Sequence, residues 1–196
     1  YVDLSQTTHD WGAMAKTDSE SRTATDAAAQ FIYHVAVSLN AQFGDPSGSP
    51  ASGKQLENAI RYQWGYNNIS RRTMNVISKS AFGYSDSEWA DLIRSELDAG
   101  RPVIYMAQEA EEDAGHAFVI DGYRDDGTVH INWGWGGYAN RYVDPNEMTD
   151  HRGRKWNRDA MIYVGLEPTE GHAASLLPEG STGSEGYTWT GNGSLI

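Results

Sequence analysis

The chain has 196 residues, of which 39% are hydrophobic and 11% aromatic, so it is long enough to bury a core and too rich in aromatic residues for general disorder. Its 15 basic and 27 acidic residues give a formal net charge of −12, and so negative a surface repels phosphate backbones and anionic lipids. We therefore expect neither a nucleic-acid partner nor a membrane partner, and no apolar run approaches the ~18 residues that a membrane span needs.

The N-terminal half is predicted to be helical. Apolar residues recur at helical spacing over 24–40, and weaker patterns predict helices over 54–62 and 71–78. Residues 85–88 read as a capping box, which predicts a helix that ends at Gly100. The chain between the first two helices is dense in glycine, proline and serine, which is typical of a loop.

The sequence pattern changes to short runs rich in β-branched and aromatic residues after Pro102. These runs predict strands over 103–106, 117–123, 129–133 and 161–166, with a turn at 124–127. Helices followed by strands favour an α+β fold with an antiparallel sheet. From the composition we expect one domain over 1–167, and a glycine- and serine-rich tail or linker over 168–196.

The chain has six histidines, and His116 differs from the other five. His9, His151 and His172 lie in polar sequence, whereas His34 and His130 are expected to be structural. His116 follows a glycine and begins a predicted strand, and the predicted hairpin brings Asn132 close to it. An asparagine oxygen beside a histidine ring can fix its tautomer, and Trp133 would shield that contact from water. A packed hairpin without catalytic function is the alternative that the spacing leaves open.

Other chemistry has weaker support in the sequence. Residues 109–113 form an acidic run, but they lack the glycine turn and the ligand spacing of a calcium loop, so we expect a solvated loop. No Walker pattern is present, and no serine lies in a nucleophile-elbow sequence. We expect no metal and no cofactor. The absence of cysteine excludes disulfides, thiolate metal sites and a cysteine nucleophile within these residues.

Two motifs carry a resemblance to a known family. The sequences GHAFVIDG at 115–122 and NWGWGG at 132–137 closely resemble the catalytic half of the streptopain family of secreted bacterial cysteine peptidases, which have a papain-like fold. Shorter matches at 10–14, 32–44 and 47–49 extend the resemblance, which covers about residues 9 to 168. The resemblance implies an α+β papain-like fold and a protein or peptide substrate outside the bacterial cell.

The resemblance also implies roles for individual residues. His116 becomes the general base, Asn132 orients it and Trp133 shields it. The residues implied to bind substrate lie in two loops and at the start of the histidine strand: Ser47, Gly48, Ser49, Gly115, Gly134, Trp135, Gly136 and Gly137.

The departure from the family concerns the nucleophile. In the family, the nucleophilic cysteine begins a helix that precedes the segment matched here, so we expect the papain-like fold to lack this first helix. One hypothesis is that the thiol comes from a missing or separate segment, or from a propeptide. A second is a catalytically inactive homologue that binds peptides or partners, and a third is a mutated or rearranged protein. Without a cysteine, these 196 residues are expected to be inactive on their own.

Overall fold

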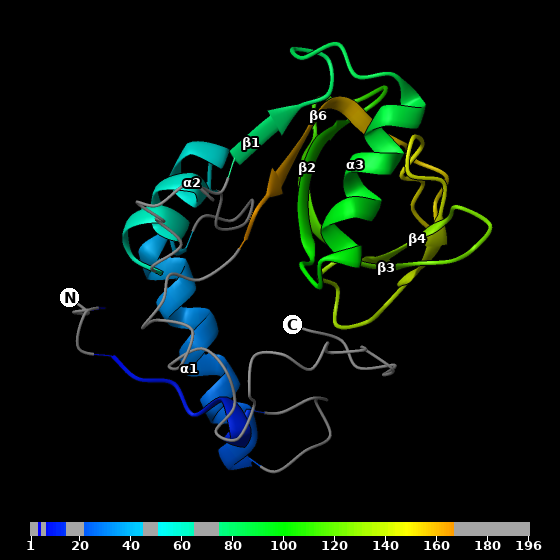
Figure 1. Ribbon diagram of the computed structural model, residues 1–196. Coiled ribbons are helices and arrows are strands. Elements are labelled where there is room, and N and C mark those ends of the chain that lie inside the picture. The colour runs from blue at the N-terminus through cyan, green and yellow to red at the C-terminus, as the bar shows by residue number, and fades with distance from the viewer. Residues whose placement is uncertain (1–3, 5–6, 15–21, 45–50, 65–74, 167–196) are drawn as a thin grey trace. The chain divides into compact units, whose positions relative to one another are not determined.

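The structure of the chain is a computed structural model that describes residues 4, 7–14, 22–44, 51–64 and 75–166 (Figure 1). These residues fall into two compact units, a helical unit up to residue 64 and a sheet unit from residue 75. The substrate-loop residues Ser47, Gly48 and Ser49 lie outside the described residues, as does the expected tail. The division of the chain at residues 167 and 168 therefore stays a prediction.

The helical unit contains the short helix η2 (Trp11–Ala13) and the helices α1 (Arg22–Ser38) and α2 (Gly53–Tyr62). Both of the longer helices were expected. The start of α2 is fixed by a capping box, in which the Ser52 side chain accepts from the Gln55 amide while the Gln55 side chain accepts from the Ser52 amide. No helix among the described residues is both long enough and apolar enough to span a bilayer.

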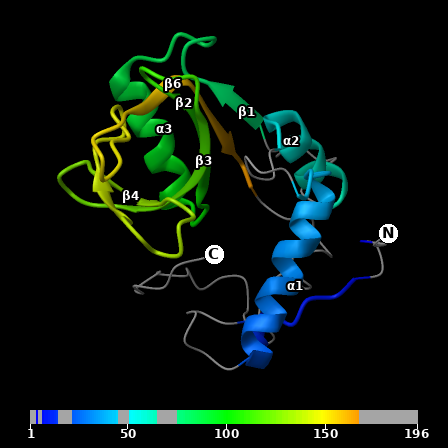
Figure 2. The ribbon, with the colours of Figure 1, turned by 180° about the vertical axis from the view of Figure 1, so that it is seen from behind.

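The sheet unit is built on six antiparallel strands in the order β1-β6-β2-β3-β4-β5. Its single helix, α3 (Asp86–Asp98), lies against β2 and β3, and the sheet curves around it, as Figures 1 and 2 show from opposite sides. The strands are β1 (Asn75–Ser78), β2 (Val103–Glu109), β3 (Gly115–Tyr123), β4 (Val129–Asn132), β5 (Arg141–Val143) and β6 (Trp156–Val164).

The core of the sheet unit lies between α3 and the concave face of the sheet. Trp89 and Ile93 of α3 are completely buried, and the Trp89 ring meets Tyr105 of β2 edge-on, with centroids 6.2 Å apart. Every second residue of β2 is buried, which is the alternation of a strand with one face on a core. The predicted capping box and glycine end of α3 are confirmed, since Ser85 and Glu88 cap the helix and Gly100 has φ +72°.

The structure corrects two expectations. A helix was predicted over 71–78, but residues 75–78 form β1, and the other four lie outside the described residues. The β-branched pair Val76 and Ile77 suits a strand, and β1 pairs along its whole length with β6, a partner more than eighty residues away. The three-residue strand β5 was missed, because so short a run carries no readable alternation.

A buried carboxylate, Glu96, joins α3 to Arg101 before β2 and to Gly165 after β6. Glu96 is 7% exposed, and its carboxylate accepts two hydrogen bonds from the Arg101 guanidinium, at 2.7 and 2.9 Å, and a third from the Gly165 amide at 2.8 Å. Burial alone raises the pKa of Glu96, but the bonds from Arg101 and Gly165 outweigh it and leave the pKa below its ordinary value. The ionised carboxylate therefore stabilises the folded state.

We predict that Glu96→Gln lowers the free energy of unfolding at pH 7 by about 2–3 kcal/mol, because Arg101 loses a desolvated charge partner. Because the folded-state pKa is depressed, the stabilisation is present above the ordinary glutamate pKa and is lost as the pH falls through the folded value. Denaturant unfolding between pH 7 and pH 3 measures both effects. Asp98→Asn, on the exposed face of the same helix, is the matched control, and equal losses in the two variants would contradict the prediction.

Candidate active site

His116 is the second residue of β3 and lies where the sheet edge meets the loop after β4. It shares a face of β3 with the buried residues Phe118 and Ile120, and its partner across the ladder is Ala107 of β2. The strand β4 ends before it reaches His116, so one side of the ring faces the loop that begins at Trp133. The histidine is therefore half-buried and held on a rigid strand.

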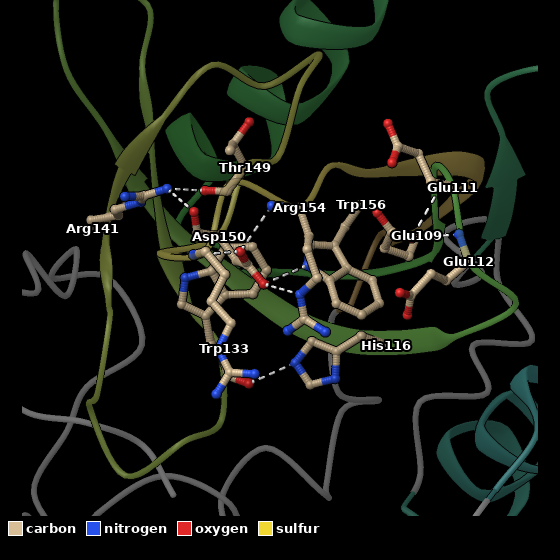
Figure 3. Close-up of polar contacts among 11 residues, drawn as sticks. Glu109, Glu111, Glu112, His116, Trp133, Arg141, Thr149, Asp150, Arg154 and Trp156 are labelled. Carbon is tan, nitrogen blue, oxygen red and sulfur yellow. Dashed lines mark hydrogen bonds and ion pairs between the residues drawn. The ribbon is translucent and has the colours of Figure 1, made fainter.

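The imidazole of His116 is oriented by a backbone carbonyl (Figure 3). Its Nε2 lies 3.0 Å from the carbonyl oxygen of Trp133. A carbonyl can only accept a hydrogen bond, so Nε2 carries the proton and donates it. The neutral ring then has its lone pair on Nδ1, which makes Nδ1 the nitrogen that can take up a proton.

The backbone on either side of this carbonyl is itself held by two asparagines. The Gly134 amide, which belongs to the same peptide group as the Trp133 carbonyl, donates to Asn132 Oδ1 at 3.0 Å. The Trp133 amide donates to Asn140 Oδ1 at 3.1 Å. Hydrogen bonds on both sides of the Trp133 carbonyl fix the direction in which it points, so they also fix the His116 ring.

This geometry differs from the expected one in the place of Asn132. In the ladder Asn132 lies opposite Val119, further along β3 than His116, and a register shift between Ile120 and Gly122 gives it this partner. The Asn132 oxygen is bonded to the Gly134 amide, and the contact with the His116 Nε2 comes from the Trp133 carbonyl. The sequence suggested the right segment but not which atom of it meets the histidine.

Aromatic rings enclose His116. The Trp135 ring stacks on it with centroids 5.1 Å apart and planes inclined by 22°, and Trp156 lies 5.4 Å away. Trp133 is completely buried, and its ring is nearly parallel to both His116 and Trp135. Three tryptophan rings therefore lie against the imidazole, and the expected shielding role of Trp133 stays a prediction.

Burial sets the protonation state of His116. Burial lowers the pKa below the ordinary histidine value of 6.5, and the positive charge of Arg154 lowers it further. The hydrogen bond to Trp133 and the negative charge of Asp150 both raise the pKa. The net effect is a lowered pKa. In the described structure His116 is therefore neutral near pH 7 and able to accept a proton.

The remaining predicted site residues form the loop after β4. Gly134, Gly136 and Gly137 have φ of +75°, +59° and +81°, in the left-handed region that glycine adopts without strain. No atom lies within 4 Å of an added Cβ at Gly134 or Gly136, so the space beside them is open. Gly115 is exposed at the start of β3, next to His116. The structure therefore brings Gly115, Trp135 and the three glycines to one edge of the sheet unit.

The sequence analysis missed a buried carboxylate close to His116. Asp150 is 1% exposed, and its two oxygens accept hydrogen bonds from the amides of Arg152 and Arg154, the Arg154 Nε and the Trp156 indole (Figure 3). Burial raises the pKa of Asp150, but these bonds together outweigh it and leave the pKa lowered. The partners of its carboxylate all lie within six residues of it, but the sequence carries no motif that marks this turn.

The acidic run over 109–113 is only partly the solvated loop that was expected. Glu109 is the last residue of β2 and is 4% exposed, and its carboxylate accepts the amides of Glu111 and Glu112 at 3.1 and 2.5 Å. The residues that follow it are exposed. Within the described part of the chain, no group of three or more histidine, cysteine or acidic side chains could hold a metal ion.

The other histidines lie elsewhere. His9 Nε2 and His34 Nδ1 are 2.9 Å apart in the helical unit, and His130 Nδ1 is 2.5 Å from Asp121 Oδ1 in the sheet unit. His151 is half-buried and packs edge-on against Trp135. His172 lies outside the described residues.

Known proteins resemble this chain in sequence. The model of the family described as Peptidase C10 matches residues 1–143. The thiol protease/hemagglutinin PrtT of Porphyromonas gingivalis is 33% identical over 180 residues, and streptopain of Streptococcus pyogenes is 31% identical over 176 residues. These alignments cover 88% and 86% of this chain but 20% and 42% of the relatives, so the chain spans less than half the length of either relative.

Solved structures resemble it in fold. The active wild-type interpain A cysteine protease of Prevotella intermedia matches with a TM-score of 0.72 and 30% identity, over 82% of this chain and 65% of that chain. A prointerpain A fragment from the same organism matches with a TM-score of 0.64 and 31% identity, over 84% and 50% of the two chains. The expected α+β papain-like fold is confirmed.

We predict that NMR of the 196-residue chain finds the neutral His116 ring protonated on Nε2, with a pKa below 6.5. Donation to the Trp133 carbonyl fixes the tautomer, and burial lowers the pKa. The ¹⁵N shifts of the two ring nitrogens, followed through a pH titration, measure both properties. A proton on Nδ1 would show that the Trp133 carbonyl does not hold the ring, and a pKa above 6.5 would show that burial does not control its protonation.

Proposed function

The chain belongs to the Peptidase C10 family, and we propose on this basis that it is the histidine-bearing part of a cysteine endopeptidase that hydrolyses peptide bonds. The nucleophilic thiol comes from a segment outside these 196 residues, because the sequence contains no cysteine. The observation that carries the proposal is the hydrogen bond between His116 Nε2 and the Trp133 carbonyl, which leaves Nδ1 free to receive a proton from a thiol.

His116 is the general base and then the general acid of this reaction. Nδ1 takes the thiol proton, and the thiolate attacks the substrate carbonyl carbon. The carbon–nitrogen bond breaks as Nδ1 passes the proton to the leaving amine, and a thioester forms. Water then attacks the thioester while Nδ1 takes its proton, and the returning proton restores the thiol as the acid product leaves.

Asn132 and Trp133 position His116 for these transfers. Asn132 acts through the peptide group that it holds, since its Oδ1 fixes the Gly134 amide and thereby the Trp133 carbonyl. Asn140 holds the preceding peptide group, through the Trp133 amide. The buried Trp133 ring keeps water from the bond between the histidine and the carbonyl.

We assign substrate binding to Gly115 and to the loop of Gly134, Trp135, Gly136 and Gly137, together with Ser47, Gly48 and Ser49. The support is the open space beside Gly134 and Gly136 and the stacking of Trp135 on His116. Glycines let a peptide backbone approach closely, and the half-buried Trp135 ring adds apolar surface beside them.

The partners are a protein or peptide substrate and a cysteine-bearing segment or propeptide, and the enzyme acts outside the bacterial cell. The support is the match to a prointerpain A fragment and the bacterial source of each relative. A net charge of −12 disfavours nucleic acid and anionic membranes as partners.

A second candidate function rests on the missing thiol. A homologue without a nucleophile keeps the same edge of the sheet unit and uses it to bind peptides without cleaving them. The cysteine-free sequence is the observation that favours this reading, and the assay with His116→Ala described below separates the two functions.

We predict that Asn132→Ala and Asn140→Ala each lower kcat of the thiol-containing protein by about tenfold to a hundredfold with little change in KM, because the Trp133 carbonyl loses its fixed direction. Asn132→Asp keeps an acceptor for the Gly134 amide and should recover most of the activity. Asn157→Ala, at an exposed position of β6, is the matched control. Unaltered ¹⁵N shifts of His116 in both alanine variants would contradict a positioning role.

We predict that His116→Ala lowers peptide hydrolysis by about a thousandfold or more in the natural protein that carries the thiol, because the proton acceptor and donor are lost. Cleavage of an unstructured protein substrate is the measurement, and unchanged thermal melting confirms folding. His130→Gln, which alters a histidine bonded to Asp121 away from the site, should leave the rate unchanged. Full activity of His116→Ala would refute the assignment, and cleavage by no form of the protein would favour the binding function.

A further inference from the structure

The turn that follows β5 places a charged side chain beside His116 that the proposed reaction does not use. Arg154 donates through Nε to the buried Asp150 carboxylate at 2.8 Å, and its guanidinium lies over the Trp156 ring, 5.0 Å from the centroid. His116 contacts the same ring from 5.4 Å. Figure 3 shows the guanidinium next to the imidazole, with both groups against Trp156.

The Arg154 side chain is held in place through Nε, and its other nitrogens are available to a ligand. The bond to Asp150 occupies Nε, and within the described residues the two terminal Nη groups have no hydrogen-bond partner, while the side chain is 32% exposed. The Nη groups of an arginine held in this way form a rigid fork that matches a carboxylate. Neutralising Asp150 needs only one of the five guanidinium N–H donors, so the other four remain for a ligand.

Two acidic side chains of the same turn region, Asp150 and Glu147, are engaged elsewhere in the described structure. Asp150 accepts four hydrogen bonds of its own turn, and Glu147 pairs with Lys155 at 2.6 Å. The acidic loop faces Arg158, which donates to the Glu112 carbonyl and lies 3.8 Å from Asp113. Within the described residues, Asp150 and Glu147 therefore leave the Arg154 Nη groups available to an incoming carboxylate.

We propose that Arg154 forms a cationic subsite that binds an Asp or Glu side chain of the substrate residue directly after the scissile bond. This inference rests on the proposed function, in which His116 protonates the amine of that same residue. The amine must come within about 3 Å of His116 for the transfer. Because His116 and Arg154 contact one tryptophan ring, a side chain on that residue reaches the guanidinium.

The test uses the 196-residue chain and two capped peptides, acetyl-Glu-Ala-Ala-amide and acetyl-Gln-Ala-Ala-amide, which differ in one charge. NMR titration of the His116 and Trp156 side-chain signals gives both dissociation constants. We expect the Glu peptide to bind about fivefold more tightly than the Gln peptide, which is the contribution typical of a partly exposed charge pair. The difference in affinity should shrink at high salt. Equal affinity, or no binding of either peptide up to its solubility, would overturn the proposal.

Two variants assign the effect to one side chain. Arg154→Lys keeps a positive charge beside Asp150, so we expect it to fold, but it lacks the planar pair of Nη donors. This variant should bind the Glu and Gln peptides with equal affinity. Arg152→Gln removes an exposed charge from the same turn, and this variant should still bind the Glu peptide more tightly than the Gln peptide. A difference that persists in Arg154→Lys would place the subsite elsewhere.

The peptide-binding test of the subsite and the cleavage assay of the proposed function can fail independently of each other. If the thiol-containing protein cleaves peptides but this chain shows no preference for the Glu peptide, the subsite is wrong and the peptidase stands. If the preference depends on Arg154 but the natural protein cleaves nothing, the peptidase is wrong and the subsite stands.

Discussion

The hydrogen bond from the His116 ring to the Trp133 carbonyl is the constraint on which the rest of the site depends. It fixes the tautomer, so it decides which nitrogen can exchange a proton, and it fixes the plane of the ring. A backbone carbonyl can do this only if its own peptide group cannot rotate. Asn132 holds that peptide group through the Gly134 amide, and Asn140 holds the preceding one through the Trp133 amide. The orientation of the His116 ring therefore depends on its own bond to the Trp133 carbonyl and on the asparagine bonds that hold the backbone around that carbonyl.

The surroundings of His116 balance two opposing effects. Burial among Trp135, Trp156 and Trp133 lowers its pKa and keeps the ring neutral, whereas a thiolate partner would favour the protonated ring. A histidine that is neutral alone and cationic beside a thiolate is suited to move a proton in both directions. The aromatic rings also strengthen the hydrogen bond to the carbonyl, because they exclude water from it.

Much of the fold could be predicted from the sequence, because its signals are local. The capping box of α3, its glycine end and the strand runs around His116 are each readable within a few residues. Contacts that form only through folding could not be read. Val76 and Ile77 form a strand because the distant β6 pairs with them. Asp150 lies within six residues of Arg154 and Trp156, but no motif marks the turn that joins them. The same limit applies to the site: the motif showed which segment faces His116, whereas the register shift in β3 decides which atom of it does.

The central claim is that this chain supplies a histidine to a thiol that lies outside its 196 residues. The most direct measurement is the intact mass of the protein from its natural source, under native and then denaturing conditions, after iodoacetamide treatment. The account predicts an alkylated cysteine in a polypeptide that is continuous with this chain or released from it on denaturation. A single unalkylated species of 21.6 kDa would contradict it, since no thiol would then be present for His116 to activate.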